Sequence, residues 1–204
     1  MKKSCRRVDV IAEAKLPTLH GKFQIIAFRS KTPGDAKDHV VLVKGRVAGA
    51  SNVPVRMHSE CLTGDVFGSL RCDCHAQLQA ALCKIGKMQR GLIIYLRQEG
   101  RGIGLSNKIR AYALQEKGMD TVEANIALGF PADMRSYDAA AAILRKLKVK
   151  SIALITNNPD KMEKLSACGV NVARRIPHEF GLTNRNRKYM KTKKDKMAHF
   201  LSGV

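Results

Sequence analysis

The sequence predicts an α/β fold of the α+β kind, in which a mixed β-sheet carries helices packed against it. Segments up to residue 55 resemble strands separated by turn formers, whereas the chain after residue 74 alternates between helical and strand-like patterns. The 204 residues are 45% hydrophobic, which suffices for a core without disulfide bonds. We therefore expect N-terminal antiparallel hairpins followed by strand–helix alternation, in one domain covering residues 1–204.

The N-terminal part is expected to form the hairpins. Strand-like runs rich in β-branched and aromatic residues cover 22–28, 39–47 and 53–58. The turn formers "KTPGDAKD" and "AGASN" separate them. Short strands joined by such turns are typical of antiparallel pairing.

The second part alternates between apolar residues at helical spacing and short apolar runs that suit buried strands. Capping residues support the helices, with Ser106 as an N-cap, Gly118 just beyond a helix end and Pro159 in a first turn. The expected elements are a helix over 78–88, a strand over 91–96, helices over 106–118 and 136–149, a strand over 151–156, a helix over 157–169 and a strand over 171–176.

The chain is strongly basic, with 37 Lys and Arg against 17 Asp and Glu and a net charge of +20. Such a balance attracts polyanions, among them nucleic acids, nucleotides and acidic lipids. The basic C-terminal segment of about 184–204 has helical spacing at Tyr189, Met197 and Phe200, which we interpret as one solvated helix. Aromatic residues make up only 5% of the chain, too few for base stacking, so we do not expect nucleic acid as a partner.

The N-terminus and the cysteines indicate in which cellular compartment the protein is expected. The N-terminus "MKKSCRRVDV" has basic residues but no apolar run long enough for a signal peptide, and no segment could span a bilayer. We therefore expect a reduced, cytoplasmic protein without a membrane partner, whose six cysteines are free thiols or metal ligands.

Three cysteines, Cys61, Cys72 and Cys74, lie close together in the sequence. Cys72 and Cys74 can point the same way in an extended or tightly turned backbone, and a segment with two glycines can bring Cys61 back to them. Three thiolates favour zinc, and a fourth position left to water is typical of a catalytic site. A closed structural site with His58 or His75 as fourth ligand, or three buried thiols, fits the spacing equally well, so these alternatives stay open.

Five motifs follow one another over nearly the whole chain: "VRMHSECLTGDVFGSLRCDC", "YLRQEGRGIGLSNKIRAYALQ", "DTVEAN", "GFPADMRSYD" and "LITNNPDK". In this order they resemble the GTP cyclohydrolase II family, hydrolases that open GTP in the first step of riboflavin biosynthesis. The resemblance implies release of formate and pyrophosphate to give 2,5-diamino-6-(5-phosphoribosylamino)pyrimidin-4(3H)-one. It also implies a homodimer, and we expect no fused butanone-phosphate synthase domain in so short an N-terminus.

The resemblance implies a catalytic zinc, one ion per chain, on Cys61, Cys72 and Cys74. Zinc lowers the pKa of a bound water, which suits hydrolysis at C8 of the guanine ring. The implied catalytic residues are Tyr112 near the zinc, Asp133 as proton acceptor and Arg135 as nucleophile toward the α-phosphate. Because guanidinium is protonated at ordinary pH, a bidentate phosphate clamp is the milder alternative for the arginine.

The resemblance also assigns a set of substrate-binding residues. Carboxylates among them can accept hydrogen bonds from guanine N1–H and N2–H₂, which adenine does not offer. The triphosphate usually brings Mg²⁺, which we expect to be held mainly by the substrate. The implied substrate-binding residues are Arg56, Met57, His58, Ser59, Glu60, Gln77, Glu99, Gly100, Arg101, Thr121, Thr156 and Lys161.

Two residues depart from the family pattern: His75 stands where relatives commonly have glycine, and Asp160 where they often have a basic residue. A divergent cyclohydrolase with a different product, formylated or lacking only pyrophosphate, is therefore one alternative. A basic nucleic-acid-binding protein with a structural zinc is the other. This second alternative explains the charge but gives no reason for Tyr112, Asp133 and Arg135 to occur together.

Overall fold

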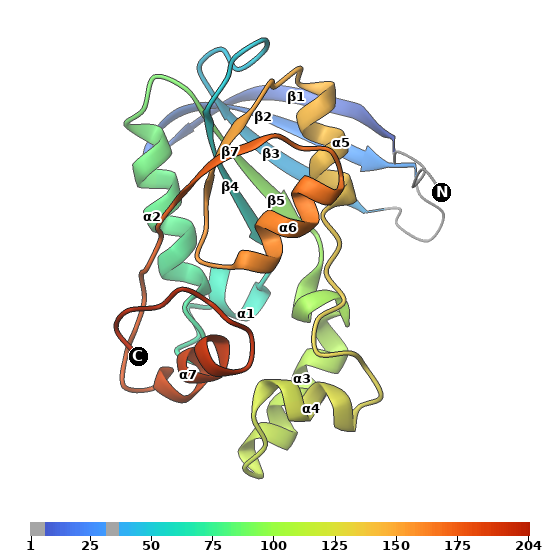
Figure 1. The fold of residues 1–204 in the computed structure, drawn as a ribbon, viewed down its shortest axis with the longest axis vertical. Coiled ribbons are helices and arrows are strands. Elements are labelled where there is room, and N and C mark those ends of the chain that lie inside the picture. The colour runs from blue at the N-terminus through green and yellow to red at the C-terminus, as the bar shows by residue number, and fades with distance from the viewer. Residues whose placement is uncertain (1–6, 32–36) are drawn as a thin grey trace.

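The computed structural model describes residues 7–31 and 37–204. Its centre is a seven-stranded mixed sheet with the order β1-β2-β3-β5-β4-β6-β7 (Figure 1). The strands are β1 (Val8–Thr18), β2 (Gly21–Ser30), β3 (Asp38–Lys44), β4 (Val53–Ser59), β5 (Gly91–Leu96), β6 (Ile152–Ile155) and β7 (Val172–Ile176). The helices are α1 (Leu62–Asp65), α2 (Cys74–Gly86), the 3-10 helix η1 (Glu99–Gly102), α3 (Leu105–Glu116), α4 (Thr121–Ala127), α5 (Asp138–Lys146), α6 (Pro159–Ala167) and α7 (Arg187–Asp195). The expected α/β class is confirmed.

One half of the sheet is antiparallel. β1 pairs with β2, β2 with β3, and β3 with β5, all antiparallel. β2 and β3, which were predicted from their β-branched and aromatic residues, alternate between buried and more exposed residues. β1 was not predicted, because as an edge strand its residues are mostly exposed and it contains Pro17, so alternation is weak.

The other half of the sheet is parallel. β4 was expected to extend the hairpins, but it lies between β5 and β6 and is parallel to both. Helix α2 joins β4 to β5, because parallel neighbours need a crossover connection. β7 is parallel to β6, so four strands end at the same edge of the sheet. In such sheets ligands bind in the crevice outside the carboxyl ends of the strands.

Helices cover both faces of the sheet. Helices α5 and α6 pack against one face, where the alanines of α5 and Leu165 join Val55, Leu92 and Leu154 in the larger core cluster. Helix α2 covers the opposite face through Ile85, around which Leu78 and Leu82 pack. The remaining helices, α1, α3, α4 and α7, gather below the carboxyl edge of the parallel strands (Figure 1).

Short helices in the connections were not predicted, because four to seven residues carry too little periodicity. Helix α4 has a capping box, in which the Asp120 carboxylate accepts from Val122 N and Glu123 N while Glu123 accepts from Asp120 N. Helix α3 begins at Leu105, and its N-cap is Gly104, at φ 85°, two residues before Ser106, which was expected in that position.

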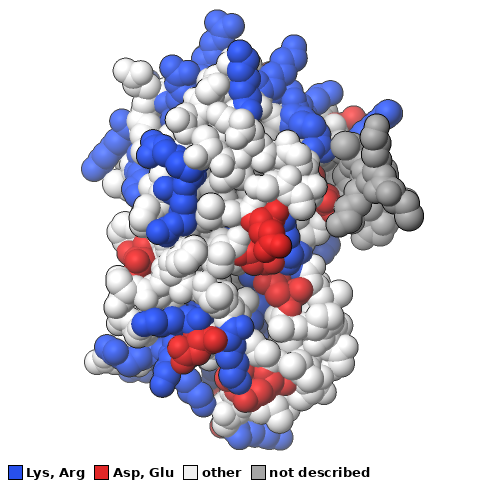
Figure 2. Space-filling model, viewed as in Figure 1, with Lys and Arg blue, Asp and Glu red and all other residues white. Residues whose placement is uncertain are grey.

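Basic side chains are spread over the surface. Figure 2 shows Lys and Arg at the upper end, along the left side and at the lower end of one face, with Asp and Glu in a few groups and other residues over most of its middle. Helix α7 lies within the basic C-terminal segment and carries several of these charges. In the described ranges, no helix has the length and apolar character needed to cross a bilayer.

Candidate active site

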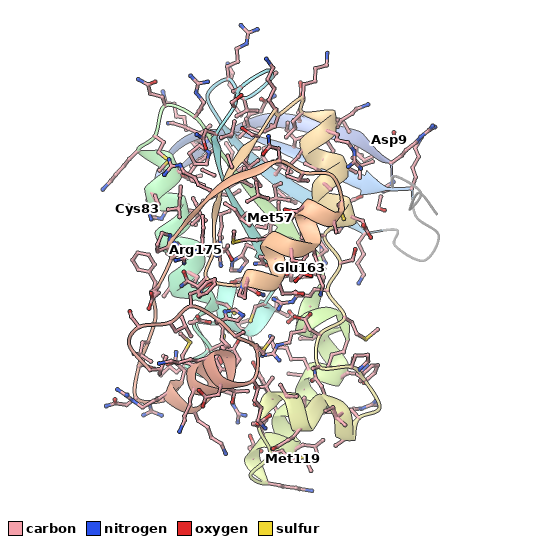
Figure 3. All side chains as sticks on the ribbon, in the orientation of Figure 1. Asp9, Met57, Cys83, Met119, Glu163 and Arg175 are labelled. Carbon is pink, nitrogen blue, oxygen red and sulfur yellow. The ribbon has the colours of Figure 1, made fainter. Side chains whose placement is uncertain are left out.

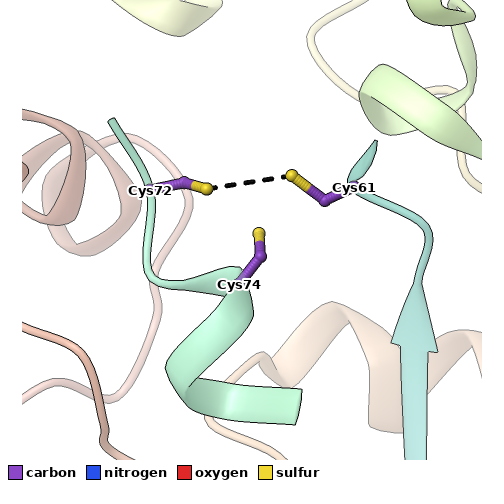
Figure 4. A group of neighbouring side chains, drawn as sticks. All are labelled: Cys61, Cys72 and Cys74. Atoms are coloured by element: carbon purple, nitrogen blue, oxygen red, sulfur yellow. Dashed lines mark hydrogen bonds between the residues drawn. The ribbon is translucent and has the colours of Figure 1, made fainter. Parts of the chain in front are cut away.

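Three thiols meet beyond the carboxyl edge of the parallel strands (Figure 4). Cys61 follows β4, Cys72 lies in the turn before α2, and Cys74 is the first residue of α2. Their sulfur atoms lie within 4.8 Å of one another, with 3.8 Å between Cys61 Sγ and Cys72 Sγ. A side chain at Gly64 would place its Cβ 2.8 Å from Cys72 Sγ, so this glycine leaves the space that the cluster needs. The donor set and its closeness fit a zinc ion.

A cation touches the thiol cluster. Nζ of Lys108 lies 3.1 Å from Cys61 Sγ and 2.8 Å from Oε1 of Glu99. Hydrogen bonds from the other two thiols, together with Lys108, lower the pKa of the Cys61 thiol, whereas the hydrogen bonds to Cys61 raise the pKa of Cys72 and Cys74. A lowered pKa favours the thiolate, which is the metal-binding form. The sequence analysis missed Lys108, although it lies four residues before Tyr112 and so shares a face of α3 with it.

The two histidines that could close a structural site have other partners. Nε2 of His58 lies 2.9 Å from Oδ1 of Asp65, to whose Oδ2 the Tyr95 hydroxyl donates at 2.8 Å. His75 is exposed, and its Nδ1 lies 3.3 Å from the Asp65 carbonyl oxygen. Among the residues with described positions, the one group of side chains close enough together to hold a metal ion contains only the three thiols. This arrangement favours an open fourth position.

A cavity that we call the thiol chamber opens beside the cluster. The Tyr112 hydroxyl lies 3.1 Å from Thr63 Oγ1, and burial raises the pKa of this phenol. The ring also lies beside the cations of Arg71 and Lys108, at 4.8 and 5.7 Å from its centroid. The predicted site residues that line the thiol chamber are Ser59, Glu60, Cys61, Cys72, Cys74, Glu99, Gly100, Arg101, Tyr112, Thr121 and Arg135.

A second cavity, which we call the basic chamber, adjoins the first. Both chambers are lined by Ser59, Cys74, Arg101, Arg135 and Tyr189, so they form one continuous site. The predicted site residues that line the basic chamber are Arg56, His58, Ser59, Cys74, Gln77, Arg101, Arg135, Thr156 and Lys161. Further lining residues, which the sequence analysis missed, are Asp73, Asn157, Asn158, His178, Lys193 and His199.

Polar atoms in the basic chamber lack protein partners. Within the described part of the chain, six lining residues each have a buried side-chain atom without a hydrogen bond: Arg56 Nε, His58 Nδ1, Arg101 Nη1, Asn158 Oδ1, His178 Nδ1 and His199 Nε2. Buried polar groups are costly when unpaired and are rare in folded proteins. Their concentration here indicates a site for a polar ligand.

Arg135 is held by Asp133. Nε of Arg135 donates to both carboxylate oxygens at 2.9 and 3.0 Å, and Nη2 donates to Oδ2. Burial alone would raise the pKa of Asp133, but hydrogen bonds and charge from Arg135 lower it overall. Arg135 lines both chambers, whereas Asp133 lines neither. Asp133 therefore contacts Arg135 from outside the chambers and acts on the site by holding its guanidinium.

Lys161 is a deeply buried cation of the site, and its Nζ donates to the Met57 carbonyl oxygen at 2.9 Å. Burial, followed by the charges of Arg56 and Arg135, lowers its pKa. Met57 itself points into the core beside the sheet and lines neither chamber (Figure 3). Asp160, one of the departures from the family pattern, pairs with Lys164 at 3.0 Å instead of lining either chamber.

Comparison with known proteins gives the same family over most of the chain. The family model for GTP cyclohydrolase II matches residues 9–177. A GTP cyclohydrolase-2 of Aeromonas hydrophila is 53% identical over 94% of this chain and 96% of its own. The riboflavin biosynthesis protein RibBA of Endomicrobium trichonymphae is 49% identical over 97% of this chain and 48% of its own.

Among solved structures, the two-domain 3,4-dihydroxy-2-butanone 4-phosphate synthase RibBX from A. baumannii gives a TM-score of 0.48. It is 18% identical and covers 85% of this chain and 40% of its own. The family match covers most of the chain, and full-length relatives are about half identical to it. The chain therefore belongs to the GTP cyclohydrolase II family, enzymes that hydrolyse GTP in riboflavin biosynthesis.

Proposed function

We propose that the chain is a zinc-dependent GTP cyclohydrolase II that hydrolyses the imidazole ring of guanine and releases formate and pyrophosphate. The product would be 2,5-diamino-6-(5-phosphoribosylamino)pyrimidin-4(3H)-one. One observation supports this proposal above the others: a thiol cluster and a cation-lined cavity form two ends of one continuous site. The first end suits ring hydrolysis and the second a triphosphate.

Cys61, Cys72 and Cys74 would hold a single zinc ion. The closeness of their sulfur atoms supports this assignment. When bound, zinc supplies Lewis acidity next to the guanine C8 position. His58 and His75 are engaged with Asp65, which favours a catalytic ion over a structural one.

The thiol chamber would bind the guanine base. Glu99 already accepts hydrogen bonds from Leu62 N, Gly100 N and Lys108, so its carboxylate holds the loop near the thiols. Glu60 lines the same chamber, and among the described residues its carboxylate forms an ion pair with Arg97 at 2.9 Å. We therefore assign to the Glu60 carboxylate the role of hydrogen-bond acceptor for guanine N1–H and N2–H₂. The Tyr112 hydroxyl would transfer a proton as the ring opens.

The basic chamber would bind the triphosphate. Burial by itself lowers the pKa of the Arg135 guanidinium, but the hydrogen bonds and the charge of Asp133 outweigh it, so that the pKa is raised. A guanidinium held in its protonated form is a poor nucleophile, so we assign Arg135 to a clamp on the phosphate and Asp133 to its orientation. Mg²⁺ would accompany the triphosphate and be held mainly by its oxygens. Arg56, Arg101, Thr156 and Lys161 complete the proposed phosphate contacts.

The decisive experiment is to incubate zinc-loaded protein with GTP and Mg²⁺ and to identify the products by mass spectrometry. Formate and pyrophosphate should appear in equal amounts with the diaminopyrimidine, and ATP should give none of them. A product that keeps the formyl carbon, or one that lacks only pyrophosphate, would contradict the proposed reaction. The expected homodimer stays a prediction, which light scattering tests by a mass twice that of the chain.

A further inference from the structure

The C-terminal segment forms a wall of the basic chamber. Helix α7 and the residues after it contribute Tyr189, Lys193, Met197, His199 and Leu201 to the lining. The family model ends at residue 177, so this wall lies beyond the matched region. In Figure 1 the segment lies below the carboxyl edge of the parallel strands, beside the start of α2.

Hydrogen bonds fix the wall at both ends. Nδ2 of Asn186, a buried residue just before α7, donates to the Cys72 carbonyl oxygen at 3.3 Å. Beyond the helix, Phe200 N donates to the Asn157 carbonyl oxygen at 2.8 Å. The segment therefore bridges the cysteine-bearing turn and the end of β6.

Lys193 carries the charge of this wall. Its Nζ lies 2.7 Å from Oδ2 of Asp73, and the two residues are only 7% and 2% exposed. Asp73 lies between the metal-binding cysteines and also accepts from the Gln77 side-chain amide. Gln77 in turn accepts from Arg56, so a hydrogen-bonded row runs from α7 to β4 along the chamber.

The charges of the basic chamber do not balance within the protein. Its lining includes five cations, Arg56, Arg101, Arg135, Lys161 and Lys193. Asp73 is the one carboxylate among the described lining residues, and Asp133 neutralises Arg135 from behind. Burial lowers the pKa of Lys161 and of His199, and the charge of Lys193 lowers both further. A buried ion pair that served stability alone would not need this excess, whereas a polyanion would relieve it.

We propose that Lys193 is a further substrate-binding residue, which contacts the triphosphate of GTP from the C-terminal wall, and that Asp73 positions its ammonium. The inference rests on the proposed function, because it takes GTP as the ligand. It gives the C-terminal segment, which lies outside the region matched by the family model, a direct contact with the substrate.

The test compares variants of the zinc-loaded, full-length protein by steady-state kinetics with GTP. Lys193→Gln can still donate a hydrogen bond to Asp73 but lacks the charge, so it should fold and raise KM for GTP by about 10- to 100-fold, with a smaller change in kcat. Lys193→Arg should recover most of the affinity. Lys191→Ala removes an exposed lysine of the same helix and should behave as the wild type.

Guanosine separates binding of phosphate from a structural effect, because it has the same base without the phosphates. Its inhibition constant should change less than about threefold in Lys193→Gln, which is a much smaller change than in KM for GTP. An unchanged KM would overturn the inference, as would a parallel loss of guanosine affinity or a loss of zinc. If the wild type fails to release formate from GTP, the proposed function fails instead, which is seen before any variant is compared.

Discussion

The ammonium of Lys108 lies 3.1 Å from the sulfur of Cys61, on the side of the thiol cluster that faces helix α3. Three thiolates and one divalent zinc would carry a net negative charge, which this ammonium offsets. Glu99 accepts from the same ammonium at 2.8 Å and from Leu62 N, and so links Lys108 to the start of helix α1, which follows Cys61. Lys108 thus occupies the place of an outer-shell partner that orients a metal ligand.

Lys108→Met keeps the length of the side chain and removes its charge. Zinc affinity should fall by about 10- to 100-fold, because outer-shell partners of metal ligands contribute on that scale. A chelator competition assay measures the change, and formate release should fall with it. Lys117→Met, at an exposed lysine just after α3, serves as the matched control. Equal zinc affinity in both variants would show that Lys108 has no such role.

The thiol cluster predicts which substitutions remove zinc. Cys72→Ser and Cys74→Ser should each lose zinc and formate release, because a hydroxyl is a poor ligand for this ion. His75→Gly should keep zinc, since the imidazole is exposed and faces the Asp65 carbonyl oxygen. Metal content by atomic emission gives the answer. Loss of zinc from His75→Gly would establish a closed structural site in place of a catalytic one.

The extent to which the sequence predicted the fold follows from the range of the interactions involved. The segments 91–96, 136–149 and 157–169 were predicted because their burial creates a local pattern. Strand β1 was not predicted, because an exposed edge strand has no such pattern. The pairing of β4 was not predicted either, because its neighbours, β5 and β6, follow much later in the chain. Pairing between distant segments leaves no signal in one sequence.

The same reasoning applies to the site. Motif residues such as Tyr112 and Arg135 were identified through the resemblance, and the structure brings them to one continuous cavity, although their roles stay predictions. Their partners were missed. Asp73 and Lys193 are 120 residues apart, and Lys108 and Cys61 are 47 apart. From sequence alone, a lysine on a helix is expected to be exposed to solvent, because its contacts with distant segments are known only from the fold.

Buried His178 predicts a loss of stability in acid. Its ring lies next to the Gln77 carbonyl oxygen at 2.8 Å, and burial, with repulsion from Arg56, lowers its pKa to about 3. Below the ordinary value of about 6.5, the unfolded chain takes up a proton that the folded protein refuses. The contribution of His178 to stability is therefore complete above that pH and is lost as the pH falls toward 3.

Urea unfolding at pH 7.5 and 5.0 measures this loss. His178→Gln removes the titrating ring, so its free energy of unfolding should fall less between the two pH values, by at most about 2 kcal/mol. The exposed His75→Gln is the control and should keep the pH dependence of the wild type. A pH dependence that is the same in His178→Gln and the wild type would mean that another group dominates.

The two ends of the site predict separable chemistry. Tyr112→Phe keeps the ring beside Arg71 and Lys108 and removes only the hydroxyl that lies 3.1 Å from Thr63. Nucleotide binding should persist while formate release falls by about 10²- to 10⁴-fold, if the phenol transfers a proton. Pyrophosphate release could then exceed formate release, which coupled assays of both products would reveal.

Arg135→Ala should act on the other end, because the guanidinium faces the basic chamber and is held there by Asp133. Pyrophosphate release should be suppressed, and formate release with it if the α-phosphate must react first. Arg135→Lys should be a weak rescue, since an ammonium keeps the charge but cannot make the planar two-point contact.

Asp133→Asn keeps the shape of the side chain and weakens its hold on Arg135. It should therefore raise KM for GTP more than it lowers kcat if the carboxylate only orients the phosphate clamp. A fall in kcat at unchanged KM would instead support Asp133 as proton acceptor. Should Tyr112→Phe and Arg135→Ala both leave the rate and the ratio of formate to pyrophosphate near wild type, the roles assigned to the two ends would be wrong.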